Sequence, residues 1–264
     1  MIKKTDNFFV ISNYNTDPSY LLAYCNNYIV YDQSEKEKYD IENSGLKYER
    51  TKHSGHNISD YFKFFIDHYD DLPQTMALIK GNIIDRHLTR SFFERVYNNK
   101  YYTFLFYDEK VLAEPARYNL SSENEFLETN TSWYVPFHPA RYFNDYNKLL
   151  RFIYKDPLIP KYCLFSPGAC YIVTREQVLK NSKEFYINLS KILSYTLEPK
   201  FPSEAHQVER MMHTIYTSNY PVHDHMNNLD AFDKALELHV LNDPKPDGPS
   251  ILQKINRYIR RLCS

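Results

Sequence analysis

The stretch Lys52–His87, KHSGHNISDYFKFFIDHYDDLPQTMALIKGNIIDRH, decides the predicted fold. Gly55-His56-Asn57 stands at the start of an amphipathic helix whose apolar side chains recur at helical spacing, and Asp70-Asp71-Leu72-Pro73 ends that helix. Thr75–Lys80 (TMALIK) follows as a buried strand, and Gly81-Asn82 comes directly after it. A helix start and the carboxyl end of a neighbouring strand converge on the crevice where open α/β sheets bind ligands. Because helix N-termini favour anions, the stretch predicts a site for a phosphorylated ligand.

The segments on either side continue this alternation of strand and helix. Strands are expected over residues 7–12, 27–31 and 101–107, and helices over 19–25, 90–97, 142–153, 175–197 and 205–216. Residues 162–173 are expected to form a strand, a turn at Pro167-Gly168 and a second strand, whereas the polar residues 111–140 are expected to be irregular. Ser59 is the expected cap of the central helix. The alternation favours an α/β fold with a mixed, mostly parallel sheet flanked by helices.

The chain is expected to divide into one α/β domain, residues 1–242, and an appendage, residues 243–264. The appendage begins with a linker (DPKPDGP, 243–249) and continues as a basic amphipathic helix over 251–262. Its apolar and basic residues are Ile251, Leu252, Ile255, Tyr258, Ile259 and Leu262, and Lys254, Arg257, Arg260 and Arg261. Such a helix can lie on an anionic membrane, or it can dock against the protein core or a partner chain.

Composition narrows the class of protein. With 264 residues, 43% of them hydrophobic, the chain can bury a sizeable core. A net charge of −1 argues against a general nucleic-acid-binding protein. The four cysteines form no CxxC pair, which is typical of reduced thiols in a cytoplasm. The N-terminus lacks the apolar region of a signal peptide, and no segment is apolar over about 18 residues, so no membrane span is expected.

Five segments carry a family resemblance: FFVISNYNTD (8–17), GHNISDYFKFFIDHYDDLP (55–73), ALIKGNIIDRH (77–87), SPGACYIVTREQVLKNSKEFY (166–186) and HQVERMMHTIY (206–216). Together they resemble the GT-A-type glycosyltransferases, and more closely an uncharacterised glycosyltransferase-like family found in fungi and bacteria. The Tyr-Asp-x-Leu-Pro ending and the Gly-Ala strand are the most specific parts, although Tyr171 stands where that family has Phe. The resemblance covers residues 8–217 and implies a GT-A-like fold and a nucleotide-sugar donor.

The resemblance implies donor-binding roles for residues that follow strands or begin the central helix. The turn after the first strand is expected to hold the nucleoside, with Tyr stacked on the base and Asn bonded to its edge. Asp32 is expected to hold uridine or ribose, and Gly55-His56-Asn57 to meet the diphosphate or the sugar. The predicted donor-binding residues are Asn13, Tyr14, Asn15, Asp32, Gly55, His56, Asn57, Gly81, Asn82, Asp85 and Arg86. An ordinary turn, strand end or helix cap is the alternative at each position.

The resemblance also raises the question of a metal ion. Most GT-A enzymes carry Asp-x-Asp after a central strand, because Mn²⁺ and Mg²⁺ prefer oxygen ligands. Here TMALIK is followed by Gly81-Asn82 and then by Asp85-Arg86-His87. Asp85 and His87 can bind a metal, or Arg86 can offset phosphate charge directly. His223 and His225 are a second candidate metal pair, with a surface loop as the alternative. Mn²⁺ or Mg²⁺ is thus a candidate cofactor, and metal-independent action stays open.

An inverting transferase needs a base beside the acceptor hydroxyl. The resemblance places an acid late in the domain, with Glu209 as the first candidate and Glu204 as the second. A surface carboxylate paired with Arg is the alternative, and a retaining enzyme needs no such base. Pro167-Gly168-Ala169 is expected to form the floor of the acceptor site, because a small residue allows close approach of the backbone, unless it is a plain hairpin turn. Trp133 and His138 are expected to cover this site, with Trp133 as an anchor of the loop to the core as the alternative.

These features predict a bacterial, cytoplasmic glycosyltransferase that builds capsule, lipopolysaccharide or another surface polysaccharide at the inner face of the membrane. Its partners would be a nucleotide-sugar donor and a glycan or lipid-linked acceptor, with peripheral membrane contact through residues 251–262 and no nucleic acid. A non-catalytic nucleotide- or carbohydrate-binding protein with the same fold is one alternative. A metal-dependent hydrolase using Asp85, His87, His223 and His225 is the other. The sequence contains no Gly-x-Ser-x-Gly elbow and no Gly-x-x-x-x-Gly-Lys loop, which disfavours serine hydrolases and P-loop enzymes.

Overall fold

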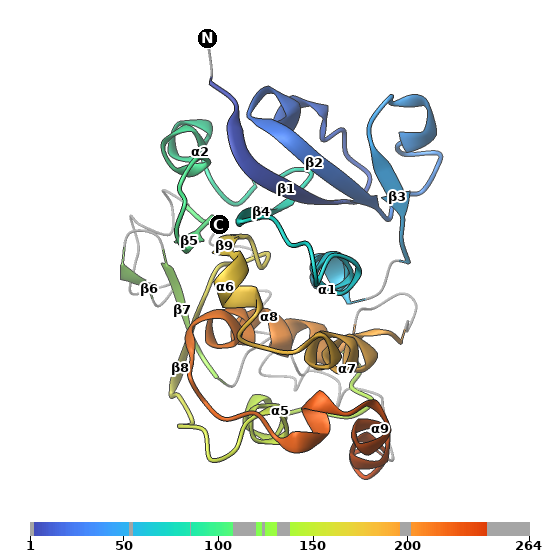
Figure 1. Ribbon diagram of the computed structural model, residues 1–264, viewed down its shortest axis with the longest axis vertical. Coiled ribbons are helices and arrows are strands. Elements are labelled where there is room, and N and C mark those ends of the chain that lie inside the picture. Colours follow the sequence, from blue (N-terminus) through green and yellow to red (C-terminus); the bar gives the residue numbers. More distant parts are fainter. Residues whose placement is uncertain are drawn as a thin grey trace, which may run out of the picture.

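The computed structural model describes residues 3–52, 55–84, 86–107, 120–122, 125–130, 138–195 and 202–241. A six-stranded sheet in the order β3-β2-β1-β4-β9-β5 is flanked by helices (Figure 1). Its strands are β1 (Thr5–Asn13), β2 (Cys25–Asp32), β3 (Tyr48–Arg50), β4 (Thr75–Lys80), β5 (Thr103–Phe104) and β9 (Tyr171–Thr174). The pairs β1–β2, β1–β4 and β2–β3 are parallel, whereas β9 is antiparallel to both of its neighbours. The predicted mixed, mostly parallel α/β sheet is therefore confirmed.

The strand order places a topological switch point at a definite edge of the sheet. The chain moves outward from β1 to β2 and β3 and then returns to β4 on the other side of β1. Such a reversal is a topological switch point, and open α/β sheets bind ligands outside the carboxyl ends of the strands there. β1 ends at Asn13 and β4 at Lys80, with Ser12 and Lys80 as partners across the pair. The predicted site residues after these strands thus lie where the topology favours a ligand.

Two hydrophobic cores cover the two faces of the sheet. Because successive strand side chains point to opposite faces, Val10, Met76 and Leu78 enter one core, while Ile11 and Ile79 enter the other. The first core is completed by α1 (His56–Asp67), α5 (Tyr146–Ile153), α6 (Arg175–Val178), α7 (Lys183–Leu193), α8 (Ser203–Thr217) and α9 (Leu229–Glu237). The second lies under α2 (Arg90–Val96) and the short 3-10 helices η1 (Ser19–Ala23) and η2 (Ile41–Asn43). In Figure 1 the helices of the first core lie below the sheet, and α2 lies on its other side.

Helix α1 begins four residues earlier than the expected cap at Ser59 implies. Its N-cap is Gly55 and its first residue is His56, so the prediction that Ser59 caps the helix is wrong. Gly55 and His56 both have left-handed φ angles, 62° and 55°, which turn the chain sharply into the helix. The residues buried on its inner face include Ile58, Tyr61, Phe62, Phe64 and Phe65. Burying each such side chain contributes about 1.5–3 kcal/mol, which fixes this helix against the sheet.

A second sheet corrects two predictions. The strands β6 (Leu120–Ser122) and β7 (Glu125–Thr129) form within the stretch 111–140 that was expected to be irregular. They join β8 (Tyr162–Phe165) in an antiparallel sheet, whereas β9 pairs with β4 and β5. The predicted strand, turn and strand over 162–173 are confirmed. The alternative of a plain hairpin turn at Pro167-Gly168-Ala169 is wrong, because β8 and β9 belong to different sheets. The turn between them, residues 166–170, crosses from one sheet to the other.

Further differences concern the ends of elements. The expected strand over 101–107 is limited to Thr103–Phe104, and the expected helix over 142–153 begins only at Tyr146, where Asp145 accepts a hydrogen bond from the backbone N–H of Lys148. The 3-10 helix η4 (Asp224–Asn227) and α9 were not predicted. No helix in the described part of the chain is long and apolar enough to span a membrane. The linker and helix expected over 243–262 lie outside the described residues.

Candidate functional site

Two of the predicted donor-binding residues, Asn13 and Asp32, meet at the carboxyl edge of the sheet. The Asn13 amide nitrogen donates to Asp32 Oδ1 at 2.8 Å, and Arg50 Nη1 lies 2.6 Å from Asp32 Oδ2. Ser34 adds a hydrogen bond from its hydroxyl to Asp32 at 2.7 Å. Both Asn13 and Asp32 are fully buried, while the Arg50 side chain is 35% exposed. The contacts of this pair are internal, so the pair shapes the strand ends and does not itself face a ligand.

The neighbouring Tyr14 and Asn15 face outward. Asn15 has a left-handed φ of 56°, its backbone N–H donates to Ser34 Oγ at 2.7 Å, and its side-chain oxygen accepts from the Glu35 N–H at 2.9 Å. The Tyr14 hydroxyl lies 3.0 Å from Glu35 Oε1, and Tyr14 is 42% exposed. The turn after β1 is thus held to the segment after β2 and presents an aromatic ring to the solvent, as a base-stacking residue requires.

Asp60, which the sequence did not single out, joins three strand ends from helix α1. Its carboxylate accepts hydrogen bonds from Ser12 Oγ at 2.5 Å, Gln33 Nε2 at 2.7 Å and Thr51 Oγ1 at 2.8 Å. These donors follow or end β1, β2 and β3. Burial raises the pKa of this carboxyl to about 7, an effect that the three hydrogen bonds oppose and the Asp32 charge reinforces. Asp60 therefore fastens α1 to the ligand-binding edge of the sheet.

The start of α1 lies against the turn between β8 and β9. The Asn57 amide donates to the Gly168 carbonyl oxygen at 2.5 Å. A Cβ at Gly55 would lie 2.0 Å from Ser59 Oγ and 2.8 Å from Leu193 Cβ, so only glycine fits at this N-cap. Two predicted groups, the donor-side helix start and the acceptor-side floor, are therefore in direct contact.

The Gly168 turn, residues 166–169, also contacts the predicted base, Glu209, and a predicted metal ligand, His87. Glu209 Oε1 accepts a hydrogen bond from the Gly168 backbone N–H at 2.6 Å. His87 packs on the other side, because a Cβ at Gly168 would come within 2.8 Å of His87 Nε2. Gly168 has φ 82° and Ala169 φ 51°, and the Ala169 N–H closes the turn onto the Ser166 carbonyl at 2.8 Å. A small residue is required here for close approach, as predicted.

Three further histidines gather beside this turn. The His206 ring on α8 lies 4.2 Å from the His138 ring and 5.1 Å from the His56 ring, measured between centroids. Burial, with the nearby His56, His138, Arg210 and Lys80, lowers the pKa of His206 far below its usual value. Burial, with Lys80 and Arg86 second, lowers the pKa of His87 to about 3. His206 and His87 are therefore neutral at physiological pH, each with one ring nitrogen as a donor and one as an acceptor.

The loop after β4 contributes close packing and one exposed cation. A Cβ at Gly81 would lie 2.2 Å from Asn13 Oδ1, so Gly81 allows this loop to approach the β1 end. Asn82 is half-buried and Arg86 is exposed. Asp85 and Trp133 lie outside the described residues, so the roles predicted for them stay predictions.

Glu204, the second candidate base, has a structural role. Its Oε1 accepts from the backbone N–H groups of Arg141, Tyr142 and Phe143 at 3.0, 2.7 and 3.0 Å, and its Oε2 accepts from the Tyr195 hydroxyl. Glu204 is fully buried, and burial raises the pKa of its carboxyl. Both oxygens are thus committed to bracing the 141–143 turn, which argues against the predicted role as a general base.

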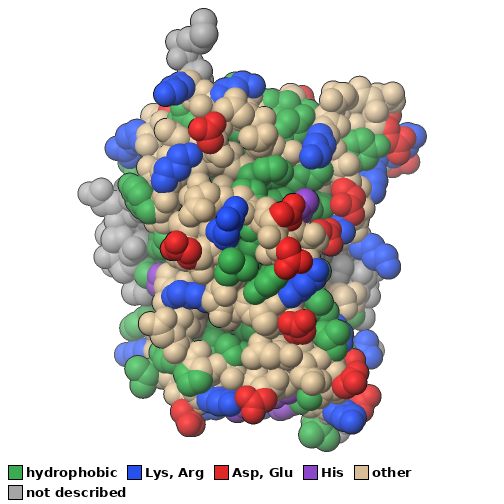
Figure 2. Space-filling model, viewed as in Figure 1, with side chains coloured by type: hydrophobic (Ala, Val, Ile, Leu, Met, Phe, Trp, Pro, Cys, Tyr) green, Lys and Arg blue, Asp and Glu red, His purple; other side chains and the backbone are tan. Residues whose placement is uncertain are grey.

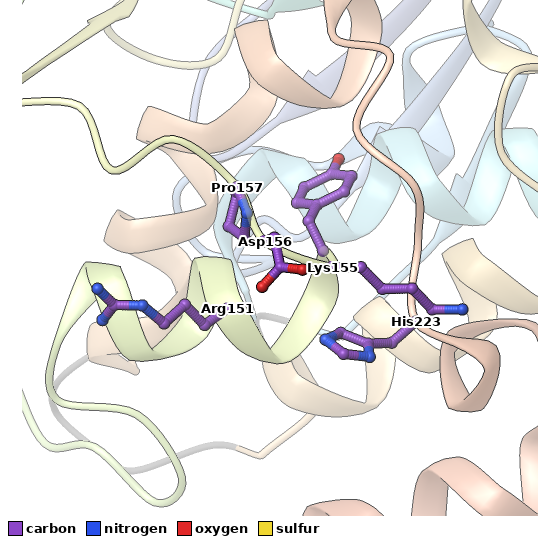
Figure 3. Close-up of a pocket in the computed structure, with 6 residues that line it drawn as sticks. Arg151, Lys155, Asp156, Pro157 and His223 are labelled. Carbon is purple, nitrogen blue, oxygen red and sulfur yellow. The ribbon is translucent and has the colours of Figure 1, made fainter.

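His223 and His225 lie in a different part of the molecule. Their rings stack at 5.3 Å, and His225 Nε2 is 2.9 Å from the Phe152 carbonyl oxygen of α5. In Figure 1, η4 lies with α5 and α9 at the end away from the six-stranded sheet. His223 borders a hollow of about 570 Å³ together with Arg151, Tyr154, Lys155, Asp156 and Pro157, shown in Figure 3. The structure therefore does not bring this pair together with His87, and the described residues contain no group of three or more His, Cys, Asp or Glu placed to hold a metal.

The described site thus unites residues that the sequence named separately, namely His56, Asn57, His87, His138, Gly168 and Glu209. It adds Lys80, Asp60, His206 and Arg210, which the sequence did not indicate. The face of the molecule seen in Figure 2 carries Lys and Arg interspersed with Asp and Glu, without a large area of one sign. Arg210 is buried, its Nη1 donates to the His206 carbonyl at 2.7 Å, and its guanidinium lies over the Phe165 ring at 4.8 Å.

A family model described as "Protein of unknown function (DUF3431)" matches residues 10–228. The chain belongs to the DUF3431 family. The match includes the described segments that contact Gly168, namely the start of α1, the loop after β4 and α8. No curated protein and no solved structure matches the chain. The description of DUF3431 states no activity, so an activity for this chain is argued from the site.

Proposed function

We propose that this chain is a glycosyltransferase that transfers a sugar from a nucleotide-sugar donor to a hydroxyl group of a glycan or glycolipid. The observation that carries the proposal is the convergence on Gly168: Asn57 from the start of α1, His87 from the loop after β4, and Glu209 from α8 all contact this turn. They do so at the carboxyl edge of the sheet, beside the switch point between β1 and β4. A donor in that crevice would meet the nucleoside-binding turn and the acceptor side together.

Glu209 is the residue best suited to act as base in an inverting transfer. Its side chain is 21% exposed, and the described contacts of its carboxylate are the Gly168 N–H at 2.6 Å and Arg210 Nη1 at 3.6 Å. A carboxylate held in this way keeps lone pairs for the acceptor hydroxyl. It would take the hydroxyl proton while the hydroxyl oxygen attacks the anomeric carbon. The bond from that carbon to the diphosphate oxygen then breaks, and its electron pair leaves with the nucleoside diphosphate.

The test begins with a thermal-shift screen of UDP-, GDP-, CMP- and dTDP-sugars, each with Mn²⁺, Mg²⁺ or EDTA. A ligand that binds only the native state raises the melting temperature by mass action. With the donor that binds, release of nucleoside diphosphate is then measured by chromatography, using simple glycosides as acceptors. Binding without release under all acceptor conditions would favour a non-catalytic binding protein on this fold. No shift with any nucleotide sugar would refute the proposal.

A pair of variants separates catalysis from folding. Glu209→Gln keeps the shape and one acceptor oxygen but removes the base, so turnover is expected to fall about 100-fold or more, while donor affinity is retained. Glu237→Gln is the matched control, since Glu237 is exposed on α9. Equal activity of the two variants would show that Glu209 is not the base, and a retaining mechanism would be examined next.

A further inference from the structure

Lys80 lies at the carboxyl edge of the sheet, beside the switch point between β1 and β4. It is the last residue of β4, and strand alternation places its side chain on the same face as Met76 and Leu78, the face covered by α1 and α8. Lys80 is half-buried, and none of the described residues forms a hydrogen bond or ion pair with its ammonium group. A half-buried lysine with no anion beside it is costly unless a ligand supplies the anion.

The neighbours of Lys80 leave its charge unbalanced. Its positive charge contributes, after burial, to the lowered pKa of both His87 and His206. Both rings are neutral, and Arg210 adds another cation on α8. The carboxylate that the structure places at the Gly168 turn, Glu209, lies 3.6 Å from Arg210. Asp60, hydrogen-bonded to Ser12, the strand partner of Lys80, has a pKa of about 7 and is largely protonated below that pH. The described part of the site therefore has a surplus of positive charge below about pH 7.

Two further features favour an anion at this place. Helix α1, with 12 residues, has no side-chain cap and no acidic residue in its first turn, so the partial positive charge of its N-terminus is not offset locally. His87 Nε2 is shielded from solvent and has no hydrogen-bond partner among the described residues, so this ring nitrogen is left for a ligand. Both lie at the Gly168 turn, α1 through Asn57 and His87 by direct packing.

We propose that Lys80 binds the diphosphate of the donor, so that the donor is held and the leaving group is neutralised without a divalent cation. That the ligand carries a nucleotide rests on the proposed function. That it carries a diphosphate rests on the charges around Lys80. As the bond between the anomeric carbon and the diphosphate oxygen breaks, the developing negative charge on that oxygen is stabilised by the ammonium group. Lysine is a common phosphate-binding residue for this reason.

The proposal is tested by calorimetry, which measures the binding of inorganic pyrophosphate and of the nucleoside diphosphates. Each is measured in EDTA and again with Mn²⁺ or Mg²⁺. The native chain is expected to bind pyrophosphate in EDTA. Lys80→Met keeps the apolar stem and removes the charge, and it should weaken binding at least tenfold, whereas Lys80→Arg should retain much of the affinity. Lys63→Met is the control, because Lys63 lies on the outer side of α1, paired with Asp67 and Glu49. Its affinity should stay within twofold of that of the native chain.

Pyrophosphate binding that requires a metal, or that survives Lys80→Met unchanged, would overturn the inference. Circular dichroism of both Lys80 variants establishes whether they are folded. If Lys80→Met does not fold, the test is made with Lys80→Arg. The two proposals can fail separately. Metal-free pyrophosphate binding that depends on Lys80 upholds the anion site even if no nucleotide sugar is turned over, in which case only the transferase proposal fails. Turnover that occurs only with Mn²⁺ or Mg²⁺ upholds the transferase and refutes the role of Lys80.

Discussion

Replacing Asp60 by Asn should change how the stability of this protein depends on pH. The carboxyl is almost completely buried, and its pKa rises from 3.8 to about 7. In the unfolded chain it loses its proton near pH 4, but in the folded chain it keeps the proton until near pH 7. Between these values the folded state binds more protons than the unfolded state, so a rise in pH destabilises the native protein.

The size of the effect follows from the pKa difference. Each pH unit between about 4 and 7 should lower the free energy of unfolding by about 1.4 kcal/mol, to a total of at most about 4 kcal/mol. Asp60→Asn removes this titration. Its amide oxygen can still accept from Ser12 and Gln33, and its NH₂ group can donate to the Thr51 hydroxyl, which rotates to accept it. The variant is therefore expected to gain stability relative to the native protein as the pH rises from 4 to 8.

Urea denaturation at several pH values measures the effect, because only the difference between the two proteins is needed and all other titrating groups cancel. Asp67→Asn is the control on the same helix: its carboxylate is 41% exposed and lies 2.7 Å from Lys63 Nζ. Exposed pairs of this kind contribute about 0–1 kcal/mol, so the control curve should run parallel to the native curve above pH 5. If the Asp60→Asn curve is also parallel, Asp60 does not hold a proton in the folded state and the reasoning is refuted.

Two further predictions concern the supports of the site. Glu204→Ala leaves the backbone N–H groups of residues 141–143 without their acceptor, so the free energy of unfolding should fall by at least about 3 kcal/mol. Urea denaturation measures this loss. A loss below about 1 kcal/mol would contradict the bracing role of Glu204. Gly55→Ala combines a left-handed φ with a Cβ only 2.8 Å from Leu193 Cβ, whereas Gly45→Ala has a similar φ of 72° and open space. Gly55→Ala should therefore lower the free energy of unfolding by about 1–3 kcal/mol more than Gly45→Ala, and equal losses would show that Leu193 yields easily.

The sequence predicts the central elements well because their signals are local. TMALIK is apolar throughout, and all of its residues but Lys80 are buried in β4. The inner face of α1 follows the helical spacing of its apolar residues. Gly168 and Glu209 were proposed from separate segments, and the structure joins them by one hydrogen bond. Local signals thus identified the elements and several site residues, but not which residues touch.

What the sequence missed depends on contacts between distant segments. Asp60 stands among apolar residues of α1, and its three partners come from the ends of three strands, so no local pattern marks it. The β8–β9 segment reads as two strands joined by a turn, but β9 pairs with β4 on one side and β5 on the other, so it has no free edge for β8. His206, in contrast, lies one helical turn before Glu209 on α8. Its spacing of three residues was a usable signal for a shared face.

The two acids of α8 show why chemistry cannot be assigned from residue type alone. Glu204 and Glu209 lie on one helix, and both were candidate bases. Glu204 accepts hydrogen bonds from three backbone N–H groups and a tyrosine hydroxyl. Glu209 accepts one from a backbone N–H, and 21% of its side chain is exposed. A carboxylate whose lone pairs are all used by the fold can no longer accept a proton from a substrate. The backbone donors around each acid therefore distinguish the two, and they leave Glu209, not Glu204, as the candidate base of the proposed transfer.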